Sequence, residues 1–255
     1  MPMIHVDYFT DPLCPWSWAA EPTLRRLEVE FSDQVRFTYV MVGMARETDP
    51  SHLLAETLEA AASSGMPADA RVWLNGAPRS SHPACLAVKA AAEQGLDGPF
   101  LRRLRVGLMT ARERIDNPEA FLAAARGVDG LDVARMDVDM RSNAIVELFA
   151  ADRDRAQAAC GDDRPSLPAF VVAGGAPLGV DGLRDAIVAA GGRPAELPQP
   201  STVLAGAGGP LATAEIASAT GLSLLRAQLA LWQLAAEHGA RPAPVPGGGE
   251  LWQAG

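Results

Sequence analysis

Cysteine, aromatic residues and basic residues are all scarce in this chain of 255 residues. It has three cysteines, 5% aromatic residues, and 22 basic against 31 acidic side chains, which gives a formal net charge of −9. Three cysteines in an unexported chain of this size do not form a disulfide framework, so each must be judged alone. Because nucleic-acid binding draws its affinity from clustered Lys and Arg, the charge balance disfavours a nucleic-acid partner.

Long apolar runs are missing as well. No stretch of about 18 or more apolar residues occurs, so the sequence predicts no membrane-spanning helix and no membrane partner. Residues 1–10 lack the basic and long apolar regions of a secretory signal and are instead typical of a strand. The four histidines have no metal-ligand spacing with any cysteine, which predicts no metal site. We therefore expect a cytoplasmic protein.

The rest of the composition is that of a globular protein. Hydrophobic residues make up 48% of the chain and charged residues 21%, which is enough to bury a sizeable core. Residues 4–9 and 35–42 are β-prone apolar runs, and residues 17–31 between them place Trp18 and other apolar residues on one helical face. A strand, a helix and a strand in this order predict a parallel pair with a right-handed crossover.

A helical insertion follows, over about residues 48–160. Helix starts are expected at Ser81, Gly98 and Asn117, each of which stands within two residues of a proline. Residues 141–160 form a long amphipathic pattern that predicts the last helix of the insertion.

Strand signals then return. Residues 169–172 and 178–180 are expected to pair across a Gly-Gly turn, and a helix over 181–190 closes the predicted domain of residues 1–192. The alternation of strands and helices places this domain in the α/β class.

The last part of the chain has a different composition. Residues 193–210 contain four prolines and few bulky side chains, which predicts a linker. Residues 211–255 then show a short helix, a Gly-containing turn, a helix over 223–237 and a hairpin over 241–252, a winged-helix pattern. This small C-terminal domain has more acidic than basic residues, so we favour protein docking over DNA binding.

The most informative motif is D-P-L-C-P-W-S-W over residues 11–18. A cysteine after a strand and at the first turn of a helix faces unpaired backbone N–H groups and the positive end of the helix dipole. Both favour the thiolate, so we expect Cys14 to be a nucleophile with a lowered pKa. Pro15 suits the first helical turn because it has no N–H to lose.

A second half of the site is expected at Leu167 and Pro168, immediately before a predicted strand. A proline there is a candidate for a cis peptide bond. The cis form would place the Leu167 backbone beside the thiol, ready to pair with an extended peptide. We therefore predict that Pro15, Trp16, Leu167 and Pro168 contact a bound substrate.

These motifs, with the strand–helix–strand start and the helical insertion, resemble the DsbA-like branch of the thioredoxin superfamily over roughly residues 3–192. With its small C-terminal domain, the whole chain resembles the SpxH (YjbH) group of ClpXP adaptor proteins. The resemblance implies a thioredoxin-like fold and a thiol site at Cys14. It also implies a protein or peptide thiol, disulfide or client protein as the partner.

One departure from the redox-active pattern limits the chemistry. Ser17 stands where the Cys-x-x-Cys motif has its second cysteine, so Cys14 cannot release a mixed disulfide within the motif. Ser17 is expected to hydrogen-bond the sulfur or to hold a bound thiol. We predict no tightly bound cofactor, and glutathione or another low-molecular-weight thiol as a transient one.

Other residues near these motifs carry weaker signals. Cys85 also lies at a predicted helix start and could act as a resolving thiol, one that attacks a mixed disulfide on Cys14 from another part of the chain. A packing role for a buried Cys85 is nevertheless favoured. Trp16 is expected at the surface and Trp18 in the core. Asp7 lies in mid-strand and could serve in proton transfer, but a lone acid is more often solvated or paired. Cys160 receives no role.

Three functions remain open from the sequence. The first is thiol–disulfide oxidoreductase or isomerase chemistry through the single thiol of Cys14. The alternative is a non-catalytic adaptor that binds a client protein for ClpXP-type proteolysis. The third is a glutathione-dependent isomerase or transferase, which needs a hydrophobic substrate pocket.

Overall fold

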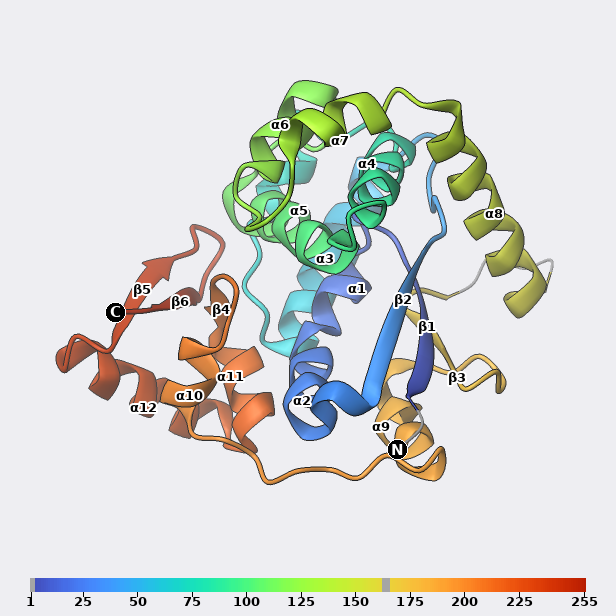
Figure 1. Ribbon diagram of the computed structural model, residues 1–255. Coiled ribbons are helices and arrows are strands. Elements are labelled where there is room, and N and C mark those ends of the chain that lie inside the picture. Colours follow the sequence, from blue (N-terminus) through green and yellow to red (C-terminus); the bar gives the residue numbers. More distant parts are fainter. Residues whose placement is uncertain (1–2, 162–165) are drawn as a thin grey trace.

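Three strands form the central sheet of the computed structural model, which describes residues 3–161 and 166–255 (Figure 1). They are β1 (Ile4–Thr10), β2 (Val35–Met41) and β3 (Ala169–Val172), in the spatial order β2-β1-β3. β1 runs parallel to β2 and antiparallel to β3. The parallel crossover predicted from the first strand–helix–strand pattern is therefore present.

The crossover contains two helices where the sequence pattern predicted one. They are α1 (Pro15–Ala19) and α2 (Glu21–Phe31), joined at Ala20, and a short 3₁₀ turn η1 (Ser32–Gln34) leads to β2. Pro22 lies in the first turn of α2, where its missing N–H is harmless. Inside one continuous helix the same proline would remove a hydrogen bond and clash with the preceding turn, so the chain starts a new helix there.

The predicted insertion is helical, and it covers one end of the sheet (Figure 1). Its elements are α3 (Pro50–Ser64), η2 (Ala70–Trp73), α4 (His82–Ala92), α5 (Asp97–Ala111), α6 (Pro118–Ala125), α7 (Val133–Asp139) and α8 (Asn143–Cys160). The starts of α4, α5 and α6 lie within one residue of the predicted positions. Buried side chains of these helices, such as Phe100 and Leu104, form the largest apolar cluster together with Leu13 and Trp18.

The predicted strand over 178–180 is wrong. Leu178 makes a single antiparallel bridge with Phe170, through two backbone hydrogen bonds of 2.9 Å. Helix α9 (Val180–Ala189) then begins with Gly179 as its N-cap, so the chain leaves the sheet after one paired residue.

The C-terminal lobe begins earlier than predicted. Helix α10 (Pro200–Ala205) lies inside the segment 193–210 that was expected to be a linker, and Val203 and Leu204 are buried. The composition was misleading because Pro200 starts this helix rather than preventing it.

Beyond α10 the predicted order of two helices and a hairpin is present. The elements are β4 (Leu211–Ala212), α11 (Thr213–Thr220), α12 (Leu224–Ala236), β5 (Ala240–Pro244) and β6 (Glu250–Ala254), with the sheet order β4-β6-β5. The assignment to the winged-helix class stays a prediction.

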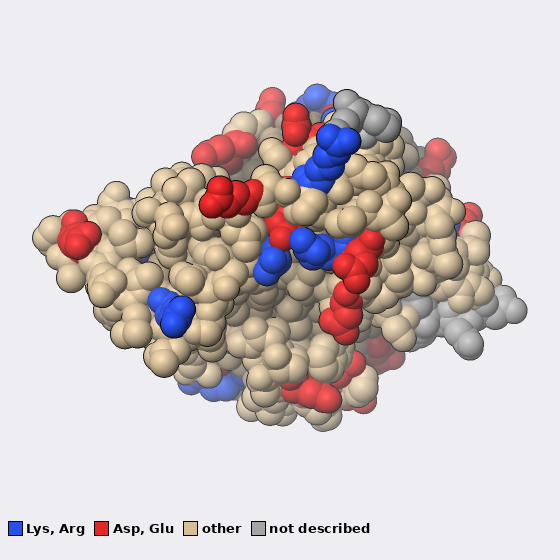
Figure 2. Space-filling model, turned by 90° about the horizontal axis from the view of Figure 1, so that it is seen from below, with Lys and Arg blue, Asp and Glu red and all other residues tan. Residues whose placement is uncertain are grey.

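The surface of this lobe was expected to lack the basic residues that bind DNA. On the face of the lobe that is seen on the left of Figure 2, most residues are uncharged and no cluster of basic residues is visible.

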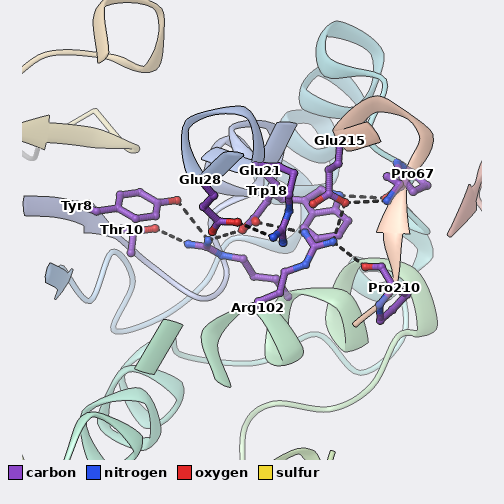
Figure 3. A network of polar contacts seen from close by, with 12 residues as sticks. Tyr8, Thr10, Trp18, Glu21, Glu28, Pro67, Arg102, Pro210 and Glu215 are labelled. Atoms are coloured by element: carbon purple, nitrogen blue, oxygen red, sulfur yellow. Dashed lines mark hydrogen bonds and ion pairs between the residues drawn. The ribbon is translucent and has the colours of Figure 1, made fainter. Parts of the chain in front are cut away.

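The C-terminal lobe packs through α11 against α2, and a buried ion network joins the two (Figure 3). Glu21 of α2 contacts Arg105 at 2.9 Å and Arg102 at 3.3 Å, and both arginines belong to α5. Arg102 also binds Glu215 of α11 at 2.7 Å and the carbonyl oxygen of Pro210 at 3.1 Å. The lobe is therefore held by charge pairs as well as by apolar contact.

No helix within residues 3–161 and 166–255 is both long and apolar enough to cross a membrane.

Candidate functional site

Cys14 lies where the chain passes from β1 into α1, and it serves as the N-cap of that helix. Its Sγ accepts a hydrogen bond from the backbone N–H of Ser17 at 3.4 Å. The residue is only 3% exposed. The three cysteines are free thiols, so Cys14 is available as a thiol rather than held in a disulfide.

The expected lowering of the Cys14 pKa is wrong. Burial raises the pKa of this thiol above its ordinary value, and the hydrogen bonds from Ser17 only partly oppose the effect. The negative charge of Asp11 raises the Cys14 pKa further. Helix α1 has five residues, so its dipole is small, whereas removal of the thiolate from water is costly.

Ser17 is fully buried and takes part in a chain of hydrogen bonds behind the thiol. Thr10 Oγ1 donates to Ser17 Oγ at 2.9 Å, and the Arg105 guanidinium donates to Thr10. Ser17 thus contacts the sulfur through its backbone N–H, and its side chain is 0% exposed. A transient thiol cofactor stays a prediction.

Ser17→Ala is expected to raise the pKa of Cys14 further, because the variant lacks the hydroxyl that favours the thiolate. It is also expected to lower the free energy of unfolding by about 1–3 kcal/mol, because the hydroxyl of Thr10 loses its buried acceptor. The pH dependence of Cys14 alkylation and urea unfolding measure the two effects. Ser201→Ala on the exposed side of α10 is the control and should change neither. An unchanged Cys14 pKa in Ser17→Ala would contradict the role of this hydroxyl.

Arg105 stands at the far end of this chain of hydrogen bonds, and it was not among the predicted site residues. Arg105 is 1% exposed, and it also donates to the Tyr8 hydroxyl at 3.2 Å and to the carbonyl oxygen of Asp11 at 3.3 Å. A signal was available, because Arg105 occupies one position of the apolar i, i+3, i+4, i+7 pattern that Leu101, Leu104 and Leu108 otherwise fill.

The second predicted half of the site is at Cys14. The peptide bond between Leu167 and Pro168 is cis, and the carbonyl oxygen of Leu167 lies 4.0 Å from Cys14 Sγ. Trp16 is partly exposed, as expected, and lines the same groove as Cys14. Pro15 is buried in the first turn of α1, so its prediction as a substrate contact is wrong.

Trp18 is a core residue, as predicted. It is 1% exposed, and its indole N–H donates to the carbonyl oxygen of Pro67 at 3.0 Å. Arg102 lies over its ring at 4.7 Å from the centroid, which places Trp18 beside the ion network rather than in the groove.

Cys85 is directed toward Asp11. Its Sγ lies 3.5 Å from Asp11 Oδ2, and burial raises the pKa of the Cys85 thiol well above its ordinary value. Asp11 also accepts the backbone N–H groups of Leu13 at 2.9 Å and Met44 at 2.8 Å. The burial and this contact agree with the packing role that the sequence favoured for Cys85, rather than with the alternative role as a resolving thiol.

Asp7 and Cys160 also have clear surroundings. Asp7 forms an ion pair of 2.5 Å with Arg155 of α8, so it is a paired acid rather than a free proton acceptor. Cys160 ends α8, is partly exposed and has no assigned role.

A groove of about 880 Å³ opens at Cys14. Its walls are the loop over residues 42–49, parts of α3 and α8, and the segment of Ser166 and Leu167. Arg46 and Arg153 face it together with acidic side chains, so the groove has mixed charge. Within residues 3–161 and 166–255, no group of three His, Cys, Asp or Glu residues could hold a metal ion.

A strand–helix–strand unit, a cysteine at the start of its helix and a cis-proline loop beside the sulfur together define a thioredoxin-fold thiol protein. A sequence profile of the thioredoxin family matches residues 8–173, and the chain belongs to this family.

Two relatives named ClpXP adapter protein SpxH are similar to more than half of the chain. The protein from Halalkalibacterium halodurans is 31% identical over 166 residues, which cover 58% of this chain and 53% of the relative. The protein from Bacillus subtilis is 32% identical over 159 residues, with 58% and 52% covered. The chain thus spans about half the length of these relatives.

A solved structure shares the fold. The cytosolic disulfide reductase DsbM from Pseudomonas aeruginosa has a TM-score of 0.60 with 21% identity, covering 73% of this chain and 97% of DsbM. The predicted DsbA-like thioredoxin fold is therefore confirmed, as is the resemblance to SpxH.

Proposed function

We propose that this protein is an adaptor that binds an extended segment of a client protein in the groove beside Cys14. The observation that carries the proposal is a groove of about 880 Å³ beside Cys14, a residue that is only 3% exposed. Such a groove has room for a peptide, but the Cys14 sulfur is hardly accessible to a reacting molecule. The name ClpXP adapter protein, carried by relatives at 31% and 32% identity, supports the same reading.

The geometry offers backbone pairing for such a segment. Leu167 lies on the groove wall next to the start of β3, where an extended peptide can add main-chain hydrogen bonds. Trp16 supplies a partly exposed aromatic ring of the kind that anchors bound proteins. Cys14 then serves as a wall residue of the groove.

The test uses a short fluorescent peptide, selected from a displayed random library on the purified full chain. Ala150 of α8 lines the groove, and its exposed neighbour Ala151 does not. Ala150→Trp should weaken binding by about tenfold or more, equal to about 1.4 kcal/mol. Ala151→Trp and Cys14→Ser should bind like the parent. Equal binding by Ala150→Trp would show that the groove is not the site.

The delivery step has a separate readout. The selected peptide is fused to a stable reporter, and degradation by purified ClpXP is followed with and without the chain. Faster degradation with the parent, and not with Ala150→Trp, supports an adaptor. Peptide binding without faster degradation would overturn the adaptor function and leave only a peptide-binding groove.

A second candidate is thiol–disulfide exchange through Cys14 alone. The N–H of Ser17 that reaches Sγ at 3.4 Å favours it, because this contact stabilises sulfur as thiolate. The Cys14 thiolate would attack a disulfide of a substrate protein, whose S–S bond breaks; one substrate sulfur stays bound to Cys14, and the other leaves as a thiolate and takes a proton. A glutathione thiolate would attack Cys14 Sγ and release the second substrate thiol, which leaves a mixed disulfide between glutathione and Cys14. A second glutathione thiolate would attack the glutathione sulfur and free the Cys14 thiolate, so that two glutathione thiols are oxidised to one glutathione disulfide for each substrate disulfide reduced.

A further inference from the structure

A second cavity, of about 710 Å³, lies apart from the Cys14 groove and shares no lining residue with it. It is bounded by the β1–β2 face of the sheet, by α2 and α5, and by the loop over residues 208–211 of the C-terminal lobe. Its volume is within the range of about 300–1,000 Å³ that is usual for small-molecule sites. Junctions between domains are also frequent positions for such sites.

The arginines in the cavity wall are already paired, and the one further charged side chain among the lining residues, Asp129, is exposed. Four arginines line the cavity, and each forms an ion pair with a glutamate that also lines it. The pairs are Arg25–Glu28, Arg102–Glu21, Arg103–Glu113 and Arg105–Glu21. Figure 3 shows Glu21 and Arg102 within the ion network. An ionic ligand would have to compete with these pairs, so the wall favours an uncharged one.

The arginine nitrogens offer no open hydrogen-bond donor to a ligand. Nε of Arg105 and Nε of Arg25 are buried and have no hydrogen-bond partner among the described residues, so a molecule in the cavity cannot reach them. Arg105 is 1% exposed, and its terminal nitrogens already donate to Tyr8, Thr10 and Glu21. The cavity therefore favours a ligand that binds by shape and apolar contact.

The sheet side of the cavity is aromatic. Tyr8, Phe37 and Tyr39 line it, and the rings of Tyr8 and Tyr39 are tilted with centroids 5.6 Å apart. Leu24 and Val106 add apolar surface from α2 and α5. Aromatic side chains pack well against flat rings in offset or edge-to-face arrangements.

We propose that this cavity binds a neutral, flat aromatic molecule. Its ring system lies against Phe37 and Tyr39, the partly exposed aromatic side chains of the sheet. The ligand touches both α5 and the loop over 208–211, so it contacts the helical insertion and the C-terminal lobe at once.

Coumarin is a suitable probe, since it is neutral, flat and aromatic. Its binding to the full chain is measured by calorimetry, beside naphthalene-2-methanol and coumarin-3-carboxylate. Coumarin and naphthalene-2-methanol should bind. Coumarin-3-carboxylate should bind at least about fivefold more weakly, because its charge meets a wall of paired charges.

Two valine substitutions localise the binding. Val106→Trp fills the cavity from α5 and should abolish coumarin binding, whereas Val138→Trp on the exposed side of α7 should leave it unchanged. Circular dichroism checks that both variants fold. If Val106→Trp fails to fold, protection of the Tyr39 ring resonances by coumarin in the parent chain gives the same localisation.

Each alternative result overturns the proposal. Absence of coumarin binding to the parent, or equal binding by Val106→Trp, shows that the cavity is not a site for this class. Tighter binding of coumarin-3-carboxylate than of coumarin shows that the site takes anions. None of these results depends on the Cys14 groove, so the adaptor proposal is tested separately.

Discussion

Glu21→Gln is expected to lower the free energy of unfolding by about 3–5 kcal/mol, the usual cost of removing one partner from a buried ion pair. Glu21 is 8% exposed and accepts from Arg105 at 2.9 Å and from Arg102 at 3.3 Å. The amide keeps the shape of the side chain but leaves two arginines with less negative charge nearby. Urea unfolding followed by circular dichroism measures the change.

The same substitution at Glu28 is the matched control. Glu28 is also in α2, but its ion pair with Arg25 is a surface pair with a glutamate side chain 46% exposed. Surface pairs contribute about 0–1 kcal/mol, so Glu28→Gln should change stability little. Similar losses for the two variants would mean that the Glu21 network is not the main attachment of α2 to α5.

Cys14 is expected to react with iodoacetamide at least about tenfold more slowly than a free cysteine at neutral pH, since only the thiolate attacks. Burial raises the pKa of Cys14, so the thiolate fraction is lower than in a free thiol with its pKa of about 8.5. The rate should rise with pH and reach its midpoint above that value. Mass spectrometry of peptides from the alkylated chain follows each cysteine separately.

Cys160 is the internal reference for this measurement. It is partly exposed at the end of α8, whereas Cys14 and Cys85 are buried, so Cys160 should be labelled first. In urea all three should react at similar rates. Rapid labelling of Cys14 with a midpoint below the value for a free thiol would instead favour the exchange chemistry over the adaptor.

The three strands of the central sheet and the two halves of the thiol site were predictable because their signals are local. Residues 35–42 are apolar and β-prone without any help from the rest of the chain, and β2 occupies them almost completely. Cys14 and Leu167 were paired because each stands at the end of a recognisable strand or helix. Their contact in the structure follows from the order of the sheet.

Other features depend on partners that are distant in sequence. Glu21 and Arg102 resemble ordinary solvent-facing residues of amphipathic helices, and only the packing of α11 against α2 makes them part of a buried network. The Cys14 pKa was mispredicted for the same reason. The helix start is visible in the sequence, but the depth of burial is set by segments such as Leu167, far along the chain.

A single side-chain oxygen atom, Glu215 Oε2, takes part both in the start of α11 and in the ion pair that joins the C-terminal lobe to α5. Glu215 Oε2 accepts the backbone N–H of Ala212, the N-cap residue of α11, and it also binds Arg102 at 2.7 Å. Unfolding of α11 would therefore remove the contact between Glu215 and Arg102 of α5. Separation of the lobe from α5 would in turn remove a charge partner of the glutamate that caps α11. A chain cut at residue 192 would lose Glu215 and the carbonyl oxygen of Pro210, two of the partners of Arg102, so we expect the unfolding of the two parts to be coupled despite their separate sheets.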